Sequence, residues 1–243
     1  MTTALRDSTV LVIGGSSGFG FKVAQLAAQA GARLIVTGRH LERLSAAVEQ
    51  LKAGSAEVVG AQLDASNSEQ LAAFFASMAP FDHLVSMAGG FMGGGFLGAD
   101  LAVIRQAIEE KLFANLQIAR LAAPRLKAGG SMTFTAGSGG RPQNASGAII
   151  GNEAIRTMVR GLAVELAPHA RANAVSPTWT RTPLWDHLPP AEVAATEHYF
   201  ATTIPLQRTA NIEEVASAYL FLMQNGFVTG QTIAVDGGIE LVS

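Results

Sequence analysis

The chain alternates short apolar runs with longer segments in which apolar residues recur every three to four positions. Near-continuous apolar runs are typical of strands covered on both faces, and the longer pattern is typical of amphipathic helices. Seven strands are predicted, at residues 9–13, 33–37, 57–63, 83–86, 131–135, 172–175 and 232–235. Helices are predicted at residues 19–30, 41–52, 69–77, 101–127, 147–167 and 212–225.

This repetition predicts an α/β protein with a single-domain, doubly wound Rossmann fold, in which helices cover both faces of a seven-stranded parallel sheet. No linker or repeat divides the chain, so residues 1–243 are expected to form one domain. Residues 182–205 interrupt the rhythm with four prolines and three large aromatic residues. They follow a strand at the edge where open α/β sheets bind ligands. We expect a substrate lid there, and an ordinary surface excursion is the alternative.

Composition excludes several classes of protein. Hydrophobic residues make up 49% of the chain and charged residues 15%, which excludes intrinsic disorder. With 17 basic and 19 acidic residues, the net charge of −2 gives no reason to expect nucleic acid or an anionic membrane as a partner. The chain has no cysteine, and its five histidines lack metal-ligand spacing, so no metal is expected. No signal peptide or membrane-spanning run is visible, and a cytoplasmic protein is expected.

A glycine-rich turn follows the first predicted strand, where residues 10–20 read V-L-V-I-G-G-S-S-G-F-G. Gly14 permits a tight turn, Gly18 lets the backbone approach a pyrophosphate, and Gly20 lets the helix pack on the strand. The two serines can donate hydroxyl hydrogen bonds to phosphate oxygens. A plain strand-to-helix turn is the alternative. The residues expected to bind a dinucleotide here are Gly14, Ser16, Ser17, Gly18, Phe19 and Gly20.

The Gly-x-x-x-Gly-x-Gly spacing of this turn resembles that of the short-chain dehydrogenase/reductase family, whose members use NAD(H) or NADP(H). The resemblance continues through the Ser-Met-Ala-Gly run at residues 86–89, the Asn-Ala-Val-Ser-Pro run at 173–177 and the segment 228–238. It implies a homo-oligomer, a tetramer or a dimer, with subunit contacts through residues 101–127 and 147–167. It also implies further cofactor contacts by Asp64, Ala65, Ala88, Gly89, Gly90, Pro177, Trp179, Thr180 and Thr182.

The end of the second strand indicates which nucleotide is bound. An NAD site needs a carboxylate at this strand end to accept a hydrogen bond from the ribose 2′-hydroxyl group. Gly38 supplies none, while Arg39 offers a guanidinium suited to a phosphate, with the Thr37 hydroxyl nearby. We therefore expect NADP(H) as the cofactor. The alternative is that Arg39 is a solvated residue at a helix start.

The residues that move the proton in this family are replaced in the present chain. In the family, a tyrosine supplies the proton, a lysine four residues later lowers its pKa, a serine polarises the carbonyl and an asparagine completes a relay. Neither Tyr199 nor Tyr219 has a lysine four residues later. Alignment through residues 161–168 places Ala148 at the tyrosine position and Asn152 at the lysine position.

Two further positions differ. Counting back from Pro124 places Lys111 at the asparagine position. Ala136 or Gly137 stands at the serine position. The side chains of Ser138 and Thr135 still provide hydroxyl groups nearby.

Two functions remain open from these residues. In the first, the protein is an atypical oxidoreductase acting on a small molecule that contains a carbonyl, enone or quinone-like group. Lys111 then acts as the acid, Ser138 polarises the substrate and Asn152 keeps part of a water relay. In the second, the protein is a catalytically inactive NADP(H)-binding sensor, scaffold or partner subunit, and Lys111 is a solvated helix residue. We favour the first because the lid and the nicotinamide-side segment are retained.

Overall fold

The computed structural model describes residues 5–54, 57–90 and 92–242. Within them lies one sheet of seven parallel strands in the order β3-β2-β1-β4-β5-β6-β7. The strands are β1 (Thr9–Ile13), β2 (Arg33–Gly38), β3 (Val58–Gln62), β4 (Phe81–Ser86), β5 (Leu126–Thr135), β6 (Ala170–Pro177) and β7 (Thr232–Val235). All seven strands predicted from the apolar runs are present, and their parallel pairing confirms the predicted fold class.

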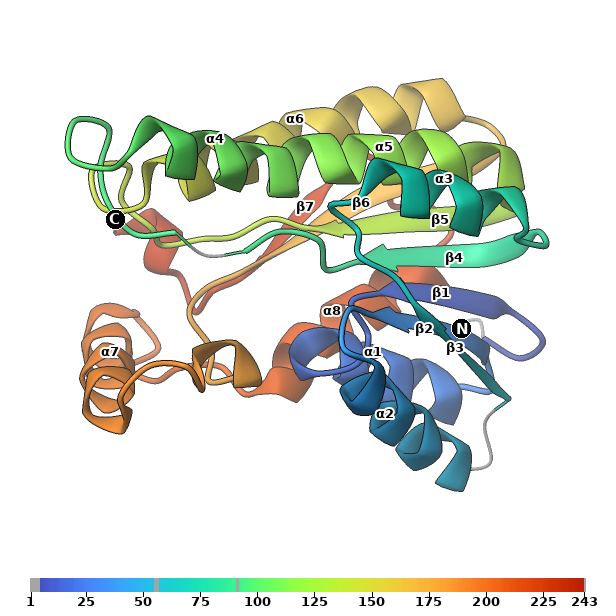
Figure 1. Cartoon of the computed structure of the whole chain (residues 1–243), viewed down its shortest axis with the longest axis horizontal. Helices are drawn as coiled ribbons and strands as arrows, with labels where there is room; N and C mark the ends of the chain where they lie inside the picture. The colour runs from blue at the N-terminus through green and yellow to red at the C-terminus, as the bar shows by residue number, and fades with distance from the viewer. Residues whose placement is uncertain (1–4, 55–56, 91, 243) are drawn as a thin grey trace.

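Helices cover both faces of this sheet (Figure 1). The α-helices are α1 (Gly18–Gln29), α2 (Leu41–Ala53), α3 (Ser68–Ala76), α4 (Leu101–Ile108), α5 (Ala114–Ala122), α6 (Ser146–Leu166), α7 (Pro190–Thr203) and α8 (Ile212–Gln224). Helices α1, α2 and α8 lie on one face, and α3, α4, α5 and α6 lie on the other. A π-helix, η1 (Glu109–Phe113), joins α4 to α5, and short 3-10 turns occupy η2 (Ala123–Arg125), η3 (Pro183–Trp185) and η4 (Ile239–Leu241).

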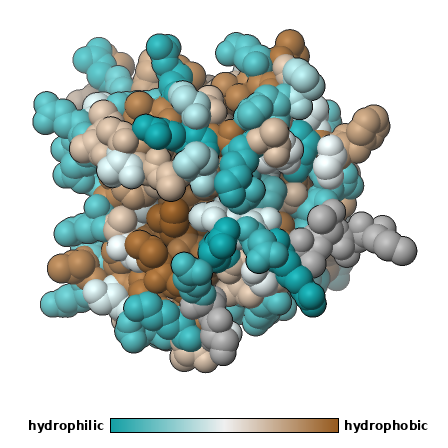
Figure 2. Space-filling model, turned by 90° about the vertical axis from the view of Figure 1, so that its right-hand side faces the viewer, coloured by the Kyte–Doolittle hydropathy of each residue, from teal (hydrophilic) through white to brown (hydrophobic). Residues whose placement is uncertain are grey.

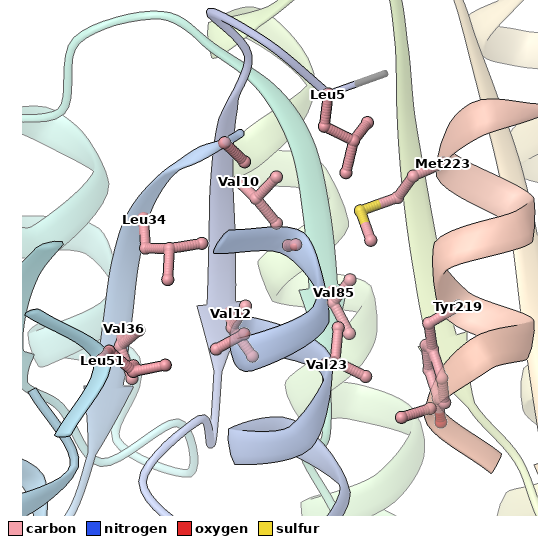
Figure 3. Packing of buried hydrophobic residues seen from close by; sticks show 14 of the residues in the cluster. Leu5, Val10, Val12, Val23, Leu34, Val36, Leu51, Val85, Tyr219 and Met223 are labelled. Atoms are coloured by element: carbon pink, nitrogen blue, oxygen red, sulfur yellow. The ribbon is translucent and has the colours of Figure 1, made fainter. Parts of the chain in front are cut away.

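The core consists of two apolar layers, one on each face of the sheet. On the α1 side, valines of β1 and β2 pack against α1, α2 and α8, and Tyr219 of α8 lies among them (Figure 3). On the other side, phenylalanines and leucines of β4 and β5 pack against α3, α5 and α6. Burial of these strands on both faces explains why their sequences are near-continuous apolar runs rather than alternations.

The sheet order defines where a ligand can enter. From β1 the chain winds outward through β2 to β3, and then returns through β4 toward β7 on the opposite side. The order therefore reverses between β1 and β4. The chain leaves the carboxyl end of β1 toward one face of the sheet and that of β4 toward the other face. Open α/β sheets bind ligands in the crevice between two such strand ends.

Two segments differ from the sequence prediction. The helix predicted over residues 101–127 is interrupted by the π-helix η1 and ends before β5, which begins at Leu126. Apolar periodicity extends across the π-turn because one inserted residue shifts the pattern by only part of a turn. The predicted lid, residues 182–205, contains the 14-residue helix α7, for which Pro190 supplies the first turn.

The opposite side of the molecule, at the amino ends of the strands, is shown in Figure 2. Hydrophilic and hydrophobic side chains are mixed there, with the hydrophobic ones gathered in the lower part of the view. Among the described residues, no helix combines the length and the apolar character needed to cross a bilayer. The same residues contain no group of three or more metal-ligating side chains.

Candidate active site

Three glycines shape the turn between β1 and α1, each for a different steric reason. Gly14 has φ +78° and Gly18 has φ +54°, a backbone conformation that L side chains rarely adopt. A methyl group on Gly20 would overlap the carbonyl oxygen of Gly14, so only glycine lets α1 start this close to the strand. The turn therefore has the close backbone approach that the glycine pattern predicted.

The turn is fixed to the neighbouring strand and leaves the first amides of α1 without a side-chain cap. The amide of Gly15 donates to the carbonyl oxygen of Thr37 at 2.9 Å, and that of Gly14 lies 3.4 Å from the Thr37 hydroxyl oxygen. Ser17, the N-cap residue, is extended and makes no side-chain cap hydrogen bond. The first amides of helix α1 therefore have no side-chain cap, an arrangement that can bind an anion at a helix start.

The carboxyl ends of β2 and β3 bring a basic and an acidic group together. Arg39 is exposed directly after Gly38, and the side chain of Ser16 lies so close that a methyl group on Gly38 would be 2.7 Å from its hydroxyl oxygen. Hydrogen bonds from the side chain and amide of Ser66 lower the pKa of Asp64, and the Arg39 charge adds to this effect. Ala65 follows, half-buried. The site therefore has an arginine at the strand end, and no carboxylate at position 38.

The end of β6 closes over the glycine turn. Thr182 is buried, and its Cβ would lie 3.6 Å from a methyl group on Gly18. Trp179, which is also buried, stacks between Trp185 and Phe200 at centroid distances of 5.9 and 6.0 Å. The Trp185 indole also donates to the carbonyl oxygen of Thr180 at 2.9 Å. Aromatic stacking thus anchors the predicted lid to the strand end. Pro177 and Thr180 are buried in the same segment.

Lys111 lies in the π-helix η1 and points back to the end of β4. Only 8% of the residue is exposed, and its stem runs beside Gly89, because a methyl group there would overlap Lys111 Cδ and lie 3.2 Å from Nζ. Burial lowers the pKa of Lys111 from its usual value near 10.5 to about 8. Within the part of the chain that the structure describes, no carboxylate forms an ion pair with its ammonium group.

The glycine turn and Lys111 meet at β4. A methyl group on Gly14 would lie 3.1 Å from Cβ of Met87, two residues before the glycine that Lys111 contacts. Ala88 between them is buried, whereas Gly89 and Gly90 are exposed. The structure thus places a buried amine and the predicted nucleotide cradle at one edge of the sheet.

Asn152 lies over the position where a serine is missing. A methyl group on Gly137 would be 2.6 Å from the Asn152 side-chain nitrogen, so a serine at position 137 would displace this amide. Ala148, one turn earlier on α6, carries no polar group. The site therefore holds an amide where the family has its lysine, and it has no phenol.

Ser138 is engaged in a polar network. Its hydroxyl oxygen lies 2.7 Å from the Ser176 hydroxyl oxygen and 3.4 Å from a carboxylate oxygen of Glu240. Arg156 joins this network through Ser176 at 3.0 Å and through an ion pair with Glu240 at 2.6 Å. The structure brings Ser138 to the β5–α6 loop, as the sequence indicated, but bonds it to the carboxyl-terminal segment rather than to Lys111.

No hydrogen bond joins either tyrosine to Lys111 among the described residues. Tyr219 is fully buried in the α1-side core (Figure 3), where its hydroxyl oxygen is 2.7 Å from that of Thr135. Burial raises its pKa, and the hydrogen bond with Thr135 opposes this only in part. Tyr199 is 52% exposed on α7 and packs edge-on against Phe200. The phenol–ammonium couple is therefore absent from the described site.

Sequence reasoning missed two residues that fix Lys111. Asn115 is fully buried, and its side chain donates to the carbonyl oxygens of Lys111 at 2.6 Å and Ala88 at 3.2 Å. Its own oxygen accepts a hydrogen bond from Ser86 at 2.6 Å. Gly151 on α6 provides the room for the lysine stem. An asparagine in a helix interior next to an apolar stripe was the available signal, because such a residue needs buried partners.

Comparison with known proteins places this architecture. The family model described as enoyl-(acyl carrier protein) reductase matches residues 14–240. The short-chain dehydrogenase/reductase fsr5 of Gibberella fujikuroi is 34% identical, with 98% of this chain and 96% of that protein covered. The chain belongs to the short-chain dehydrogenase/reductase family. The 3-oxoacyl-[acyl-carrier-protein] reductase of Mus musculus is 30% identical over 97% of this chain and 99% of its own length.

Solved structures of short-chain dehydrogenases/reductases have the same fold. A protein of this family from Brucella melitensis superposes with a TM-score of 0.88 at 28% identity, covering 98% of this chain and 99% of its own. The aldohexose dehydrogenase of Thermoplasma acidophilum gives a TM-score of 0.86 at 25% identity, covering 99% and 97%. Membership in this family means that the fold binds a nicotinamide cofactor and belongs to an oxidoreductase lineage.

The described residues fit such a cofactor. A methyl group on Gly14 or Gly20 would meet protein atoms, so glycine at these positions permits the tight path of the turn. The first amides of α1 have no side-chain cap and can bind a pyrophosphate. Thr182 and the exposed backbone of Gly89 and Gly90 follow β6 and β4 at the same edge of the sheet. The glycine turn thus fits the pyrophosphate of such a cofactor, whereas Ala148 and Asn152 stand at the positions aligned with the family's tyrosine and lysine.

Proposed function

We propose that this short-chain dehydrogenase/reductase is an NADP(H)-dependent oxidoreductase that reduces a small molecule with a carbonyl, enone or quinone-like group, and that Lys111 supplies the proton. The observation that carries this proposal is the buried Lys111 side chain beside Gly89, at the edge that also holds the glycine turn. A bound nicotinamide supplies the hydride. The residues of the chain then have to bind the cofactor, orient the substrate and protonate the substrate oxygen.

The preference for NADP(H) rests on the end of β2. Gly38 offers no carboxylate, so nothing at this position repels a 2′-phosphate, and the exposed Arg39 guanidinium can bind one with two parallel hydrogen bonds. The Asp64 carboxylate nearby accepts hydrogen bonds from Ser66, which occupies one of its oxygens. The charge at this edge therefore favours the phosphorylated nucleotide.

Lys111 meets the requirements of a general acid at neutral pH. An acid is most effective when its pKa lies near the working pH, and burial brings this ammonium to about 8. Because no carboxylate pairs with it among the described residues, its positive charge is available to a developing oxyanion on the substrate. Nζ of Lys111 would donate its proton to the substrate oxygen, and Asn152 would hold a water through which the proton is replaced.

The second function, an inactive NADP(H)-binding sensor, scaffold or partner subunit, is favoured by one observation. Gly137 and Ala148 carry no hydroxyl group, and the nearby Ser138 hydroxyl is engaged by Ser176. A substrate that needs strong polarisation of its carbonyl would then react slowly. Enones and quinones need less acid assistance, which is why they are included in the proposed substrate class.

One experiment separates the two functions. NADPH binding is measured by fluorescence titration, and NADPH oxidation is then followed at 340 nm against a panel of ketones, enones and quinones. The proposal expects saturable binding together with turnover of at least one class of acceptor. Saturable binding with no oxidation across the panel would leave the sensor or scaffold function in its place.

We also propose that the protein forms a homo-oligomer, either a tetramer or a dimer. Support comes from large apolar side chains exposed on α4 and α6: Leu101, Val103, Ile150 and Val164. Light scattering after size-exclusion chromatography would give the mass in solution directly. A monomer at micromolar concentration would remove this part of the proposal.

A further inference from the structure

The stem of Lys111 passes between two glycines that belong to different elements. On the β4 side is Gly89, and on the α6 side is Gly151, which is buried. A methyl group on Gly151 would lie 2.8 Å from Lys111 Cγ and 2.9 Å from its Cβ. Distances this short do not occur between real carbon atoms of this kind, so even the smallest side chain at position 151 would displace the lysine.

The two glycines differ in what they reveal. Gly89 has φ +117°, so its backbone conformation alone requires glycine. Gly151 lies in the regular helix α6 with no such conformation, and alanine is the better helix former there. The helix therefore has no backbone reason for a glycine at position 151, and the room it leaves is filled by Lys111.

The main chain of Lys111 cannot move away to relieve such a contact without breaking buried hydrogen bonds. Its carbonyl oxygen accepts a 2.6 Å hydrogen bond from Asn115, which is also bonded to Ala88 and Ser86 at the end of β4. These hydrogen bonds hold the π-helix η1 against the end of β4, so the main chain of Lys111 is fixed. Only the stem beyond Cβ can rotate away, so the 2.9 Å contact with Cβ would have to be relieved by a shift of α6.

We propose that Gly151 is a positioning residue, whose missing side chain lets the Lys111 stem reach the edge of the sheet beside Gly89. This inference rests on the proposed function, in which Lys111 is the proton donor. The two residues that lie against the Lys111 stem from the packed elements, Gly89 after β4 and Gly151 of α6, are uncharged. On its own element, Glu110 accepts a hydrogen bond from Gln106 at 2.7 Å through one carboxylate oxygen, and its other oxygen would lie 3.6 Å from a methyl group on Gly90.

The test compares Gly151→Ala with Gly161→Ala. Gly161 lies on the same helix, is exposed, and has nothing within 4 Å of an added methyl group, so it controls for the change in helix propensity. NADPH affinity, kcat and the pH profile are measured for both variants. We expect Gly151→Ala to keep the NADPH affinity of the parent protein and to lower kcat at least tenfold. Gly161→Ala should match the parent in all three.

A second readout does not depend on turnover. The chain has four lysines, Lys22, Lys52, Lys111 and Lys127, so labelling lysine with ¹³C at Cε and ¹⁵N at Nζ gives few NMR signals to assign. In the parent protein, the Lys111 signal should titrate near pH 8. In Gly151→Ala, the stem is displaced toward water, and the titration should move toward the ordinary range for lysine. An unchanged titration and an unchanged kcat would overturn the inference, even if Lys111 itself proves essential.

The outcomes separate this inference from the proposed function. If the parent protein oxidises NADPH with none of the acceptors, the proposed reaction fails, and the lysine titration alone decides the role of Gly151. If Gly151→Ala folds poorly, its loss in Tm is measured again in the Lys111→Gly background, where the contacts with Cγ and with Cβ are both removed. A smaller loss there supports the inference, and an equal loss contradicts it.

Discussion

At the scale of single residues, the site differs from its family in where the positive charge lies. The lysine of the family is on α6, at position 152, whereas here the amine enters from the π-helix at position 111. The sequence supplied both substitutions, because alignment alone placed Lys111 and Asn152. It could not show that Lys111 is buried, since that depends on Gly89 and Gly151, which are distant in sequence and meet only in the fold.

Replacing Lys111 by methionine should separate activity from stability. We expect kcat to fall by at least about 100-fold, as for loss of a general acid, with unchanged NADPH affinity. The pKa of Lys111 is lower in the folded chain (about 8) than in the unfolded chain (about 10.5), so the ammonium destabilises the fold below pH 8. Lys111→Met should therefore raise the free energy of unfolding at pH 7 by about 2–3 kcal/mol, measured by urea denaturation.

The pH dependence of the reduction rate tests whether Lys111 acts as the acid. The acid must carry its proton, so the reduction rate should be constant below pH 8 and fall about tenfold per unit above it. In Lys111→Met the residual rate should lose this dependence, while Lys52→Met, on the exposed face of α2, should behave like the parent. A parent profile that stays flat up to pH 10 would count against Lys111 as the acid.

Arg39 should determine the choice of nucleotide. Removing a charge-assisted contact costs about 1.5–3 kcal/mol, so Arg39→Ala should weaken NADPH binding by about 10- to 100-fold and leave NADH binding nearly unchanged. Fluorescence titration with both nucleotides gives the ratio. Arg33→Ala, at the other end of β2, serves as the control. Equal weakening for both nucleotides would indicate that Arg39 does not contact the 2′-phosphate.

At the scale of elements, apolar periodicity predicted every strand but not the break between α4 and α5. The π-turn at residues 109–113 is stabilised by Asn115, whose buried hydrogen bonds connect it to Ser86 and Ala88. These hydrogen bonds connect segments about 30 residues apart in the sequence, so the local pattern of apolar residues could not predict them. Helix α7, which lies within the predicted lid, was also missed, because its apolar side chains follow no clear helical stripe.

Helix α8 gives a test of the role of tyrosine. Tyr219→Phe removes one buried hydrogen bond with Thr135, whose hydroxyl still donates to the carbonyl oxygen of Ser86 at 2.8 Å. The free energy of unfolding should fall by about 1 kcal/mol while kcat stays the same. Tyr199→Phe on α7 should change neither quantity. A large loss of kcat in either variant would indicate that the tyrosine replaced there takes part in the reaction.

At the scale of the whole molecule, the parallel sheet with a helical layer on each face followed from the apolar pattern, because strands buried on both faces are typical of parallel sheets. The glycine turn that is predicted to bind the nucleotide lies where the strand order reverses, the position at which open α/β sheets bind ligands. The long-range polar contacts did not follow. The network of Arg156, Ser138 and Glu240 joins three segments that no local pattern relates.

The stability of the whole fold in acid should depend on His83. This histidine is buried in β4, with Nδ1 2.9 Å from the Ser131 hydroxyl oxygen, and burial lowers its pKa from 6.5 to about 4. Between these values the unfolded chain binds a proton that the folded chain does not, so the free energy of unfolding falls as the pH is lowered. The loss from pH 7 to pH 4 is about 3 kcal/mol from this group.

The variant His83→Asn keeps a hydrogen-bonding side chain that does not titrate. Urea denaturation at several pH values should show a shallower loss of stability between pH 6.5 and 4 than in the parent protein. His198→Asn, an exposed residue of α7, should leave the slope unchanged. Identical slopes for the parent and His83→Asn would show that His83 is not buried in its neutral form.

The central claim is that the chain keeps a cradle for a phosphorylated nicotinamide nucleotide and has moved its proton donor to the π-helix. A crystal structure with NADP⁺ tests both halves at once. We predict the pyrophosphate on the Gly14–Gly20 turn, the 2′-phosphate against Arg39, and Lys111 Nζ facing the space above the nicotinamide ring. Failure of NADP⁺ to bind at this turn, or a ring covered by Tyr199 with Lys111 turned away, would contradict the account.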